Sequence, residues 1–162
     1  MLTKFSHVAI CVRDLDVSVE FYGKLGFTKF FEFTDDSAIT GAVLGIEMRK
    51  ARMAFMRLGE DPRQSFLDIV QFVDPPTYGA PYPTLNNVGV CRVVFSVDDI
   101  DRTYAQLQTL GVEFVTPLQR LTTPAGDDLA MVCFKDPDGI YLEIISGLNV
   151  ARRAVDARVD QP

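Results

Sequence analysis

The chain contains an internal repeat, and this feature constrains its fold more than any other. The segment His7–Asp16 (HVAICVRDLD) is echoed by Arg92–Asp101 (RVVFSVDDID), at an offset of 85 residues (92 − 7). A second pair of similar segments, Phe66–Gln71 and Tyr141–Ser146, is offset by 75 residues (143 − 68), so the first copy carries ten extra residues (85 − 75). A duplication of this kind predicts two copies of one supersecondary module.

The first copy predicts a β-α-β-β-β module. Residues 5–12 are rich in apolar and β-branched types, as in a strand, and residues 17–25 carry an apolar stripe at helical spacing that Gly26 ends. Further strands are expected at residues 27–33 and 65–72, and residues 39–48 and 51–58 are expected to form a hairpin with Arg49 and Lys50 near its tip.

The second copy predicts the same order of elements. A helix is expected to begin near Asp98 and to end at Gly111, and Asp136–Gly139 has the composition of a tight turn between two strands. Residues 117–128 are expected to form a loop. The strands are expected at residues 89–97, 112–116, 129–134 and 140–146.

Two segments fall outside the repeated modules. Residues 74–87 contain four prolines, which exclude regular structure, so we interpret them as a connector. Its Tyr78 and Tyr82 are expected either to fold over the mouth of a site or to pack on a neighbouring subunit. The tail at residues 148–162 is either a short amphipathic helix or a frayed end. The helix would carry on one side Val150, Ala154 and Val155.

Composition narrows the class of protein. A chain of 162 residues suits one compact domain, and a net charge of −6 argues against a nucleic-acid partner. The three cysteines lie far apart in apolar runs, so we expect buried, reduced thiols rather than a thiolate metal site. No signal-peptide pattern or membrane-spanning apolar run occurs, and we expect a soluble, cytoplasmic protein without a membrane partner.

Four ionisable residues occupy equivalent positions in the repeat: His7, Asp68, Arg92 and Glu143. Because side chains alternate across a strand, each of them shares a strand face with apolar neighbours that should point inward. A buried ionisable group must be paired, bound to a metal or neutral. We therefore predict that the four side chains meet in one cavity. Aromatic neighbours, which either contact a substrate or simply pack in the core, are Phe66, Phe72 and Tyr141.

The paired modules, the early His7 and the run Asp-Pro-Asp-Gly-x-x-Leu-Glu-Ile at residues 136–144 resemble the vicinal oxygen chelate superfamily. This superfamily includes glyoxalase I, methylmalonyl-CoA epimerase, extradiol dioxygenases and the fosfomycin- and bleomycin-resistance proteins. The resemblance covers about residues 3–147. It implies one α+β domain over residues 1–147, in which modules 3–73 and 88–147 pair into a partly open mixed β-sheet barrel with flanking helices.

The resemblance also implies a divalent metal (Fe, Mn, Zn, Ni or Co) held at the four positions. Asp68 is shorter than the usual Glu but remains a competent oxygen ligand, whereas Arg92 stays protonated and has no lone pair for a cation. Either His7, Asp68 and Glu143 hold a metal as a facial triad, or Arg92 replaces the metal by pairing with one of the acids or with a ligand oxygen. An Arg–carboxylate pair at 4 Å is worth roughly 4 kcal/mol at an effective dielectric constant of 20, which favours the metal-free alternative.

Three functions follow as alternatives. The first is an enzyme of lyase, isomerase or dioxygenase type that acts on a small oxygen-rich metabolite, with His7 or Glu143 as general base and Arg92 or a metal stabilising enolate-like charge. The second is a protein that sequesters a ligand without chemistry, like the bleomycin-resistance proteins. The third is an antibiotic-modifying transferase of the fosfomycin-resistance kind. Arg92 argues against this alternative, because that branch usually relies on an intact set of metal ligands. Members of the superfamily are usually dimers, which implies a homodimer. A purely structural salt-bridge network remains the alternative to all three.

Overall fold

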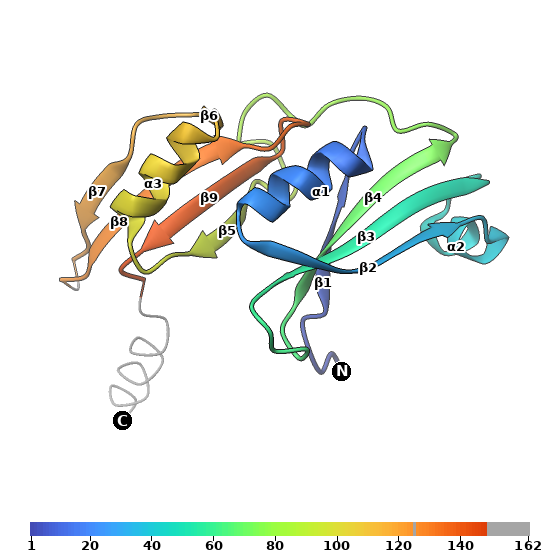
Figure 1. Cartoon of the computed structure of the whole chain (residues 1–162), viewed down its shortest axis with the longest axis horizontal. Coiled ribbons are helices and arrows are strands. Elements are labelled where there is room, and N and C mark those ends of the chain that lie inside the picture. Colours follow the sequence, from blue (N-terminus) through green and yellow to red (C-terminus); the bar gives the residue numbers. More distant parts are fainter. Residues whose placement is uncertain (125, 149–162) are drawn as a thin grey trace. The chain divides into compact units, whose positions relative to one another are not determined.

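The structure is a computed structural model that describes residues 1–124 and 126–148. The chain divides into two compact units (Figure 1). Unit 1 comprises Met1–Pro81 together with Pro137–Gly139, and unit 2 comprises Tyr82–Asp136 together with the described residues from Ile140 onward. Within unit 1, the carboxylate of Asp138 accepts hydrogen bonds from the backbone N–H and the guanidinium of Arg13.

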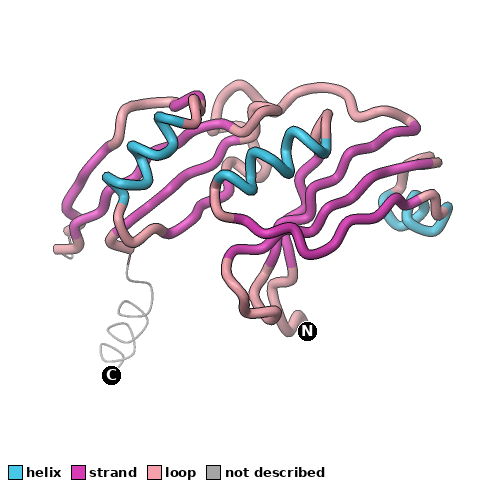
Figure 2. Tube along the Cα trace, in the orientation of Figure 1, coloured by secondary structure: helices cyan, strands magenta, loops and turns pink. Residues whose placement is uncertain are grey.

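Unit 1 is a four-stranded sheet with a ten-residue helix, α1, lying across one face (Figures 1 and 2). The strand order is β1-β4-β3-β2, with β1 and β4 parallel and the other neighbours antiparallel. The elements are β1 (His7–Cys11), α1 (Leu15–Lys24), β2 (Phe27–Asp35), α2 (Ala38–Leu44), β3 (Lys50–Leu58) and β4 (Phe66–Asp74).

Local chemistry fixes both ends of α1. The carboxylate of Asp14 accepts hydrogen bonds from the backbone N–H groups of Asp16 and Val17, which caps the first turn. After the helix, Gly26 adopts a φ of 97°, which a side chain would disfavour. The apolar residues that lie buried with α1 form the core of unit 1: Ile10, Val12, Leu15, Tyr22, Met56, Leu67 and Ile69.

The hairpin predicted for residues 39–48 and 51–58 is wrong in its first half, where the chain forms α2. Ser37 caps this helix by accepting a hydrogen bond from the N–H of Ile39 at 3.2 Å, and Gly45 ends it with a φ of 69°. Gly41 packs so closely that a Cβ there would lie 2.9 Å from the carbonyl oxygen of Ile46. Capping and close packing therefore override the strand-like apolar composition.

Unit 2 also begins with a strand, a helix and further strands, but it has five strands instead of four and no counterpart of α2 among its described residues. Its sheet runs β5-β9-β8-β6, with β7 also paired to β8 and with β5 and β9 parallel. The carboxylate of Asp99 caps α3, and the chain leaves this helix at Gly111 with a φ of 69°. The elements are β5 (Val93–Ser96), α3 (Ile100–Thr109), β6 (Glu113–Phe114), β7 (Gln119–Thr122), β8 (Asp128–Lys135) and β9 (Tyr141–Ser146).

Two strand predictions in unit 2 need correction. The strand expected at residues 89–97 is observed only over Val93–Ser96. Its partner β9 begins at Tyr141, so the residues further toward the N-terminus have no strand opposite them with which to form backbone hydrogen bonds. The loop expected at residues 117–128 contains the strand β7, which pairs with β8 from Gln119↔Met131 to Thr122↔Asp128. This edge strand is exposed along its length, so its sequence lacks the apolar alternation of a half-buried strand.

The α+β class with two β-rich modules and flanking helices is confirmed, and neither sheet closes on itself. The prediction for the tail concerns residues outside the described part of the chain beyond Leu148. None of the helices in residues 1–124 and 126–148 has the length and apolar character that a bilayer crossing requires.

The expectation of three buried cysteines is wrong for two of them. Cys11 and Cys91 are exposed and Cys133 is half-buried, and all three are free thiols. Cys11 lies at the end of β1 on the open face of its sheet, and Cys91 precedes β5, so an apolar sequence neighbourhood does not bury either of them.

Candidate functional site

The strand register of unit 1 brings His7 and Asp68 to neighbouring positions on one face of the sheet. Parallel pairing of β1 with β4 sets His7 opposite Phe66 and Ala9 opposite Asp68. Because alternate residues share a face, His7, Ala9, Phe66 and Asp68 all lie on the face opposite α1. The imidazole of His7 is exposed and stacks on the Phe66 ring, with centroids 4.9 Å apart.

Asp68 is a buried acid whose charge is poorly compensated. The residue is 9% exposed, and its Oδ1 has no hydrogen-bond partner among the described residues. Burial raises the pKa of Asp68, and the positive charge of the nearby His7 opposes that shift. Such an oxygen is suited to receive a hydrogen bond or a cation from a bound molecule.

Unit 2 brings Arg92 and Glu143 into direct contact. The Nε of Arg92 lies 2.7 Å from Oε2 of Glu143, whose side chain is 6% exposed. Burial acts to lower the pKa of Arg92, but the Glu143 carboxylate together with Cys91 and Cys133 outweighs it and the pKa is raised, so the guanidinium stays charged. Of the two acids that the sequence offered as partners for Arg92, the described contacts pair it with Glu143.

A third group, Cys133, completes this cluster and was missed by the sequence reasoning. Its Sγ donates a hydrogen bond to the same Oε2 of Glu143 at 3.2 Å. Burial, together with the Glu143 carboxylate, raises the pKa of Cys133 to about 11, so the thiol stays protonated at neutral pH. The tight turn predicted at Asp136–Gly139 could have identified Cys133, because the hairpin that this turn closes sets Cys133 opposite Glu143.

The three aromatic candidates have different surroundings. Phe66 is half-buried against His7. The hydroxyl of Tyr141 donates to the carbonyl oxygen of Pro83 at 2.7 Å, which holds the ring to the connector. Phe72 packs, together with Phe33, against a small cluster of Met48, Ala51, Met53 and Val70.

The four ionisable positions are divided between the units. His7 and Asp68 belong to unit 1, and Arg92 and Glu143 to unit 2, so their convergence in one cavity stays a prediction. Within either unit, the described residues include no group of three or more His, Cys, Asp or Glu side chains that could hold a metal ion.

The residues fit a bound divalent metal only in part. The imidazole of His7 and the unpartnered Oδ1 of Asp68 are suitable donors. Glu143 does not fit, because its Oε2 already takes a guanidinium and a thiol and any cation bound there would be repelled by Arg92. The full set of four metal ligands is therefore not present.

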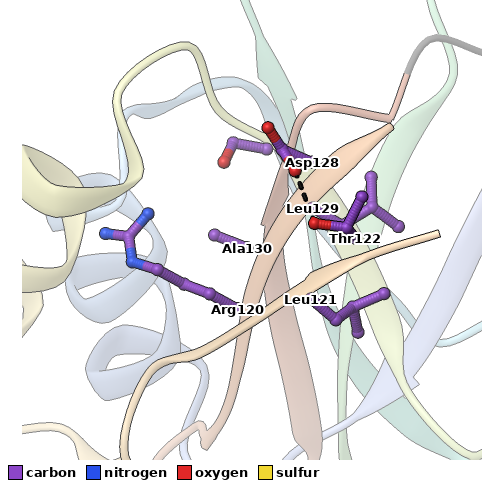
Figure 3. A pocket seen from close by; sticks show the side chains of 7 residues that line it. Arg120, Leu121, Thr122, Asp128, Leu129 and Ala130 are labelled. Carbon is purple, nitrogen blue, oxygen red and sulfur yellow. Dashed lines mark hydrogen bonds between the residues drawn. The ribbon is translucent and has the colours of Figure 1, made fainter. Parts of the chain in front are cut away.

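Each unit also contains a cavity, which loop residues line in part in unit 1 and strand residues line in unit 2. In unit 1, a cavity of about 470 Å³ lies between Cys11, Arg13 and Asp138 on one side and residues 77–81 of the connector on the other. A cavity of about 460 Å³ in unit 2 contains none of the predicted site residues (Figure 3). There the hydroxyl of Thr122 bonds the carboxylate of Asp128 at 2.7 Å, while the Arg120 side chain extends away from them.

With this geometry in place, the chain can be assigned to a family. The model of the Glyoxalase/Bleomycin resistance protein/Dioxygenase superfamily matches residues 4–144, and the chain belongs to this superfamily. The suspected relationship to the vicinal oxygen chelate proteins is thereby confirmed.

Solved structures with the same fold cover nearly the whole chain. A glyoxalase family protein from Bacillus cereus is 23% identical with a TM-score of 0.78, covering 92% of this chain and 97% of its own. A trypanothione-dependent glyoxalase I from Leishmania major is 18% identical with a TM-score of 0.67, covering 99% and 98%. A glyoxalase family protein from Enterococcus faecalis is 26% identical with a TM-score of 0.62, covering 88% and 96%. No curated protein matches the sequence.

Proposed function

We propose that this chain binds a small, oxygen-bearing metabolite and that its Arg92–Glu143 ion pair replaces part of the metal site found in related enzymes. The observation that carries the proposal is the 2.7 Å contact between Arg92 Nε and the buried carboxylate of Glu143. The guanidinium supplies a fixed positive charge at a position where the family resemblance implies a metal ligand.

Arg92 has the chemistry to hold an anionic ligand oxygen. Its side chain is 36% exposed, so the guanidinium is reachable although Nε faces Glu143. A planar guanidinium donates two parallel hydrogen bonds to a carboxylate, phosphate or enolate oxygen. Arg92 thus stabilises negative charge on a bound metabolite without a metal ion.

His7 is the residue for proton transfer. It is exposed on its strand, and an imidazole nitrogen can accept a proton from a bound molecule, which suits a general base. Glu143 is less suited to this role because its oxygen is engaged by Arg92 and Cys133. The reaction class that follows is a lyase- or isomerase-type proton abstraction next to a carbonyl group.

Metal analysis tests the first part of the proposal. Protein purified without chelators is expected to contain less than stoichiometric Fe, Mn, Zn, Ni or Co, and Arg92→His is expected to gain a bound divalent metal. Arg102→His on α3 is the matched control and is expected to gain none. Stoichiometric metal in the wild-type protein, held by His7, Asp68 and Glu143, would overturn the proposal.

Proton exchange tests the second part. A panel of 2-oxo and 2-hydroxy acids in D₂O, followed by proton NMR, is expected to include a compound whose Cα proton exchanges with the wild-type protein and not with His7→Ala. Binding of a panel compound without exchange in either protein would instead identify a ligand-sequestering protein.

The remaining predictions on assembly and location stay proposals. We propose a homodimer, because members of this superfamily are usually dimers, and light scattering that gives a monomer at micromolar concentration would contradict it. A cytoplasmic location is proposed from the sequence and is testable by cell fractionation.

A further inference from the structure

A network of aromatic rings crosses the whole sheet of unit 1. It starts at His7 on β1, continues to Phe66 on β4 with a centroid distance of 4.9 Å, and then to Phe55 on β3, again at 4.9 Å. The rings that complete it on β2 all lie within 6.0 Å of Phe55: Phe30, Phe31 and Phe33. We call these six residues the aromatic face.

The aromatic face lies on the side of the sheet that α1 does not cover. The register pairs Phe31 with Phe55 on neighbouring strands, and Phe55 in turn with Asp68, so these residues share one face. The core beneath α1 is formed by the alternating residues of the opposite face, such as Ile69 and Met56. Phe31 is 52% exposed and Phe30 41% exposed, although burial of a phenyl ring favours folding.

A buried acidic residue, Asp68, lies beside two of these rings on the same face of the sheet. Asp68 is set between Ala9 of β1 and Phe55 of β3, with Phe66 two residues away on the same strand. It is nine-tenths buried, and its Oδ1 has no hydrogen-bond partner among the described residues. Apolar rings around an unpartnered acceptor are complementary to an apolar molecule that carries one hydrogen-bond donor.

We infer that the aromatic face binds a planar aryl ligand whose hydroxyl group donates a hydrogen bond to Oδ1 of Asp68. The rings supply stacking and edge contacts, and the carboxylate selects for the hydroxyl. This inference rests on the proposed ligand-binding function, but every residue from which it is argued lies in unit 1. A second copy of the chain is a poorer occupant, because an apolar protein surface would leave the carboxylate oxygen unsatisfied.

The probes are 2-naphthol, followed by its fluorescence, and 2-methoxynaphthalene, which has the same rings but no donor. The wild-type protein is expected to bind 2-naphthol about tenfold more tightly than 2-methoxynaphthalene, because only 2-naphthol can donate a hydrogen bond to the charged acceptor. Asp68→Leu is expected to reduce this ratio to about one. Phe31→Leu removes an exposed ring and is expected to weaken both probes severalfold without changing their ratio.

Phe21→Leu on α1 is the matched control and is expected to leave both affinities unchanged. The inference is overturned if neither probe binds saturably, if Phe31→Leu binds both like the wild type, or if the ratio survives in Asp68→Leu. Sedimentation showing a dimer that Phe31→Asp dissociates, without probe binding, would assign the face to a second copy and also overturn it. Arg92→His reports on the proposed function separately, since failure to gain metal there leaves the naphthol ratio untouched.

Discussion

Removal of Arg92 should leave an uncompensated buried charge, and the cost can be worked from the geometry. Two unit charges 2.7 Å apart attract by roughly 6 kcal/mol at an effective dielectric constant of 20. The Arg92 side chain is 36% exposed, so solvent screening and the desolvation of both charges reduce the net value to less than half of that. We expect Arg92→Leu to lower the free energy of unfolding by about 2–3 kcal/mol.

A double-mutant cycle measures this interaction directly. Arg92→Leu, Glu143→Gln and the double variant are unfolded in urea and followed by circular dichroism, because the chain has no tryptophan. The double variant should recover much of the loss, with a coupling energy of about 1.5–3 kcal/mol. Arg120→Leu breaks the exposed pair with Asp101 and should cost less than about 1 kcal/mol. Strict additivity of the two single variants, within about 0.5 kcal/mol, would refute the reasoning.

Three further predictions concern other groups. Because burial and the Glu143 carboxylate raise the pKa of Cys133 to about 11, iodoacetamide at pH 8 should label it far more slowly than the two exposed cysteines, as peptide mass spectrometry would reveal. Burial raises the pKa of Asp68, so its charge lowers the stability at neutral pH, and this effect vanishes as the pH falls through the raised pKa. Asp68→Asn should therefore raise the Tm at pH 7 but not at pH 3. A lower Tm at pH 7 would contradict this. Gly147 has a φ of 81° and a Cβ there would lie 2.0 Å from a carbonyl oxygen of β8, so Gly147→Ala should lower the Tm much more than Gly111→Ala, where φ is 69° but no atom lies within 4 Å.

The repeat predicted the framework of the molecule well. Two copies of one strand–helix–strands pattern, with helices that end before Gly26 and Gly111, reappear as the two units. These features were predictable because strand alternation, helical spacing and helix-ending glycines act between residues close in sequence.

The sequence predicted which residues belong to the candidate site, but it did not predict the contacts between them. Equivalent positions in the repeat identified Glu143 and Asp68, and both are buried as an inward-pointing strand residue requires. The partner of Arg92 stayed open between the two acids, because a salt bridge depends on distances that spacing does not give. Cys133 was missed, although the register of its hairpin placed it opposite Glu143.

The sequence by itself determined the duplicated α+β framework and the identity of the four repeat-related ionisable residues. Only the tertiary structure decided that residues 38–44 form a helix and that Glu143 is held by Arg92 and Cys133. It also decided that rings from four strands form one network on the face that carries Asp68, whose Oδ1 has no hydrogen-bond partner among the described residues. The physical reason is that these outcomes depend on strand register and close packing between residues far apart in the chain.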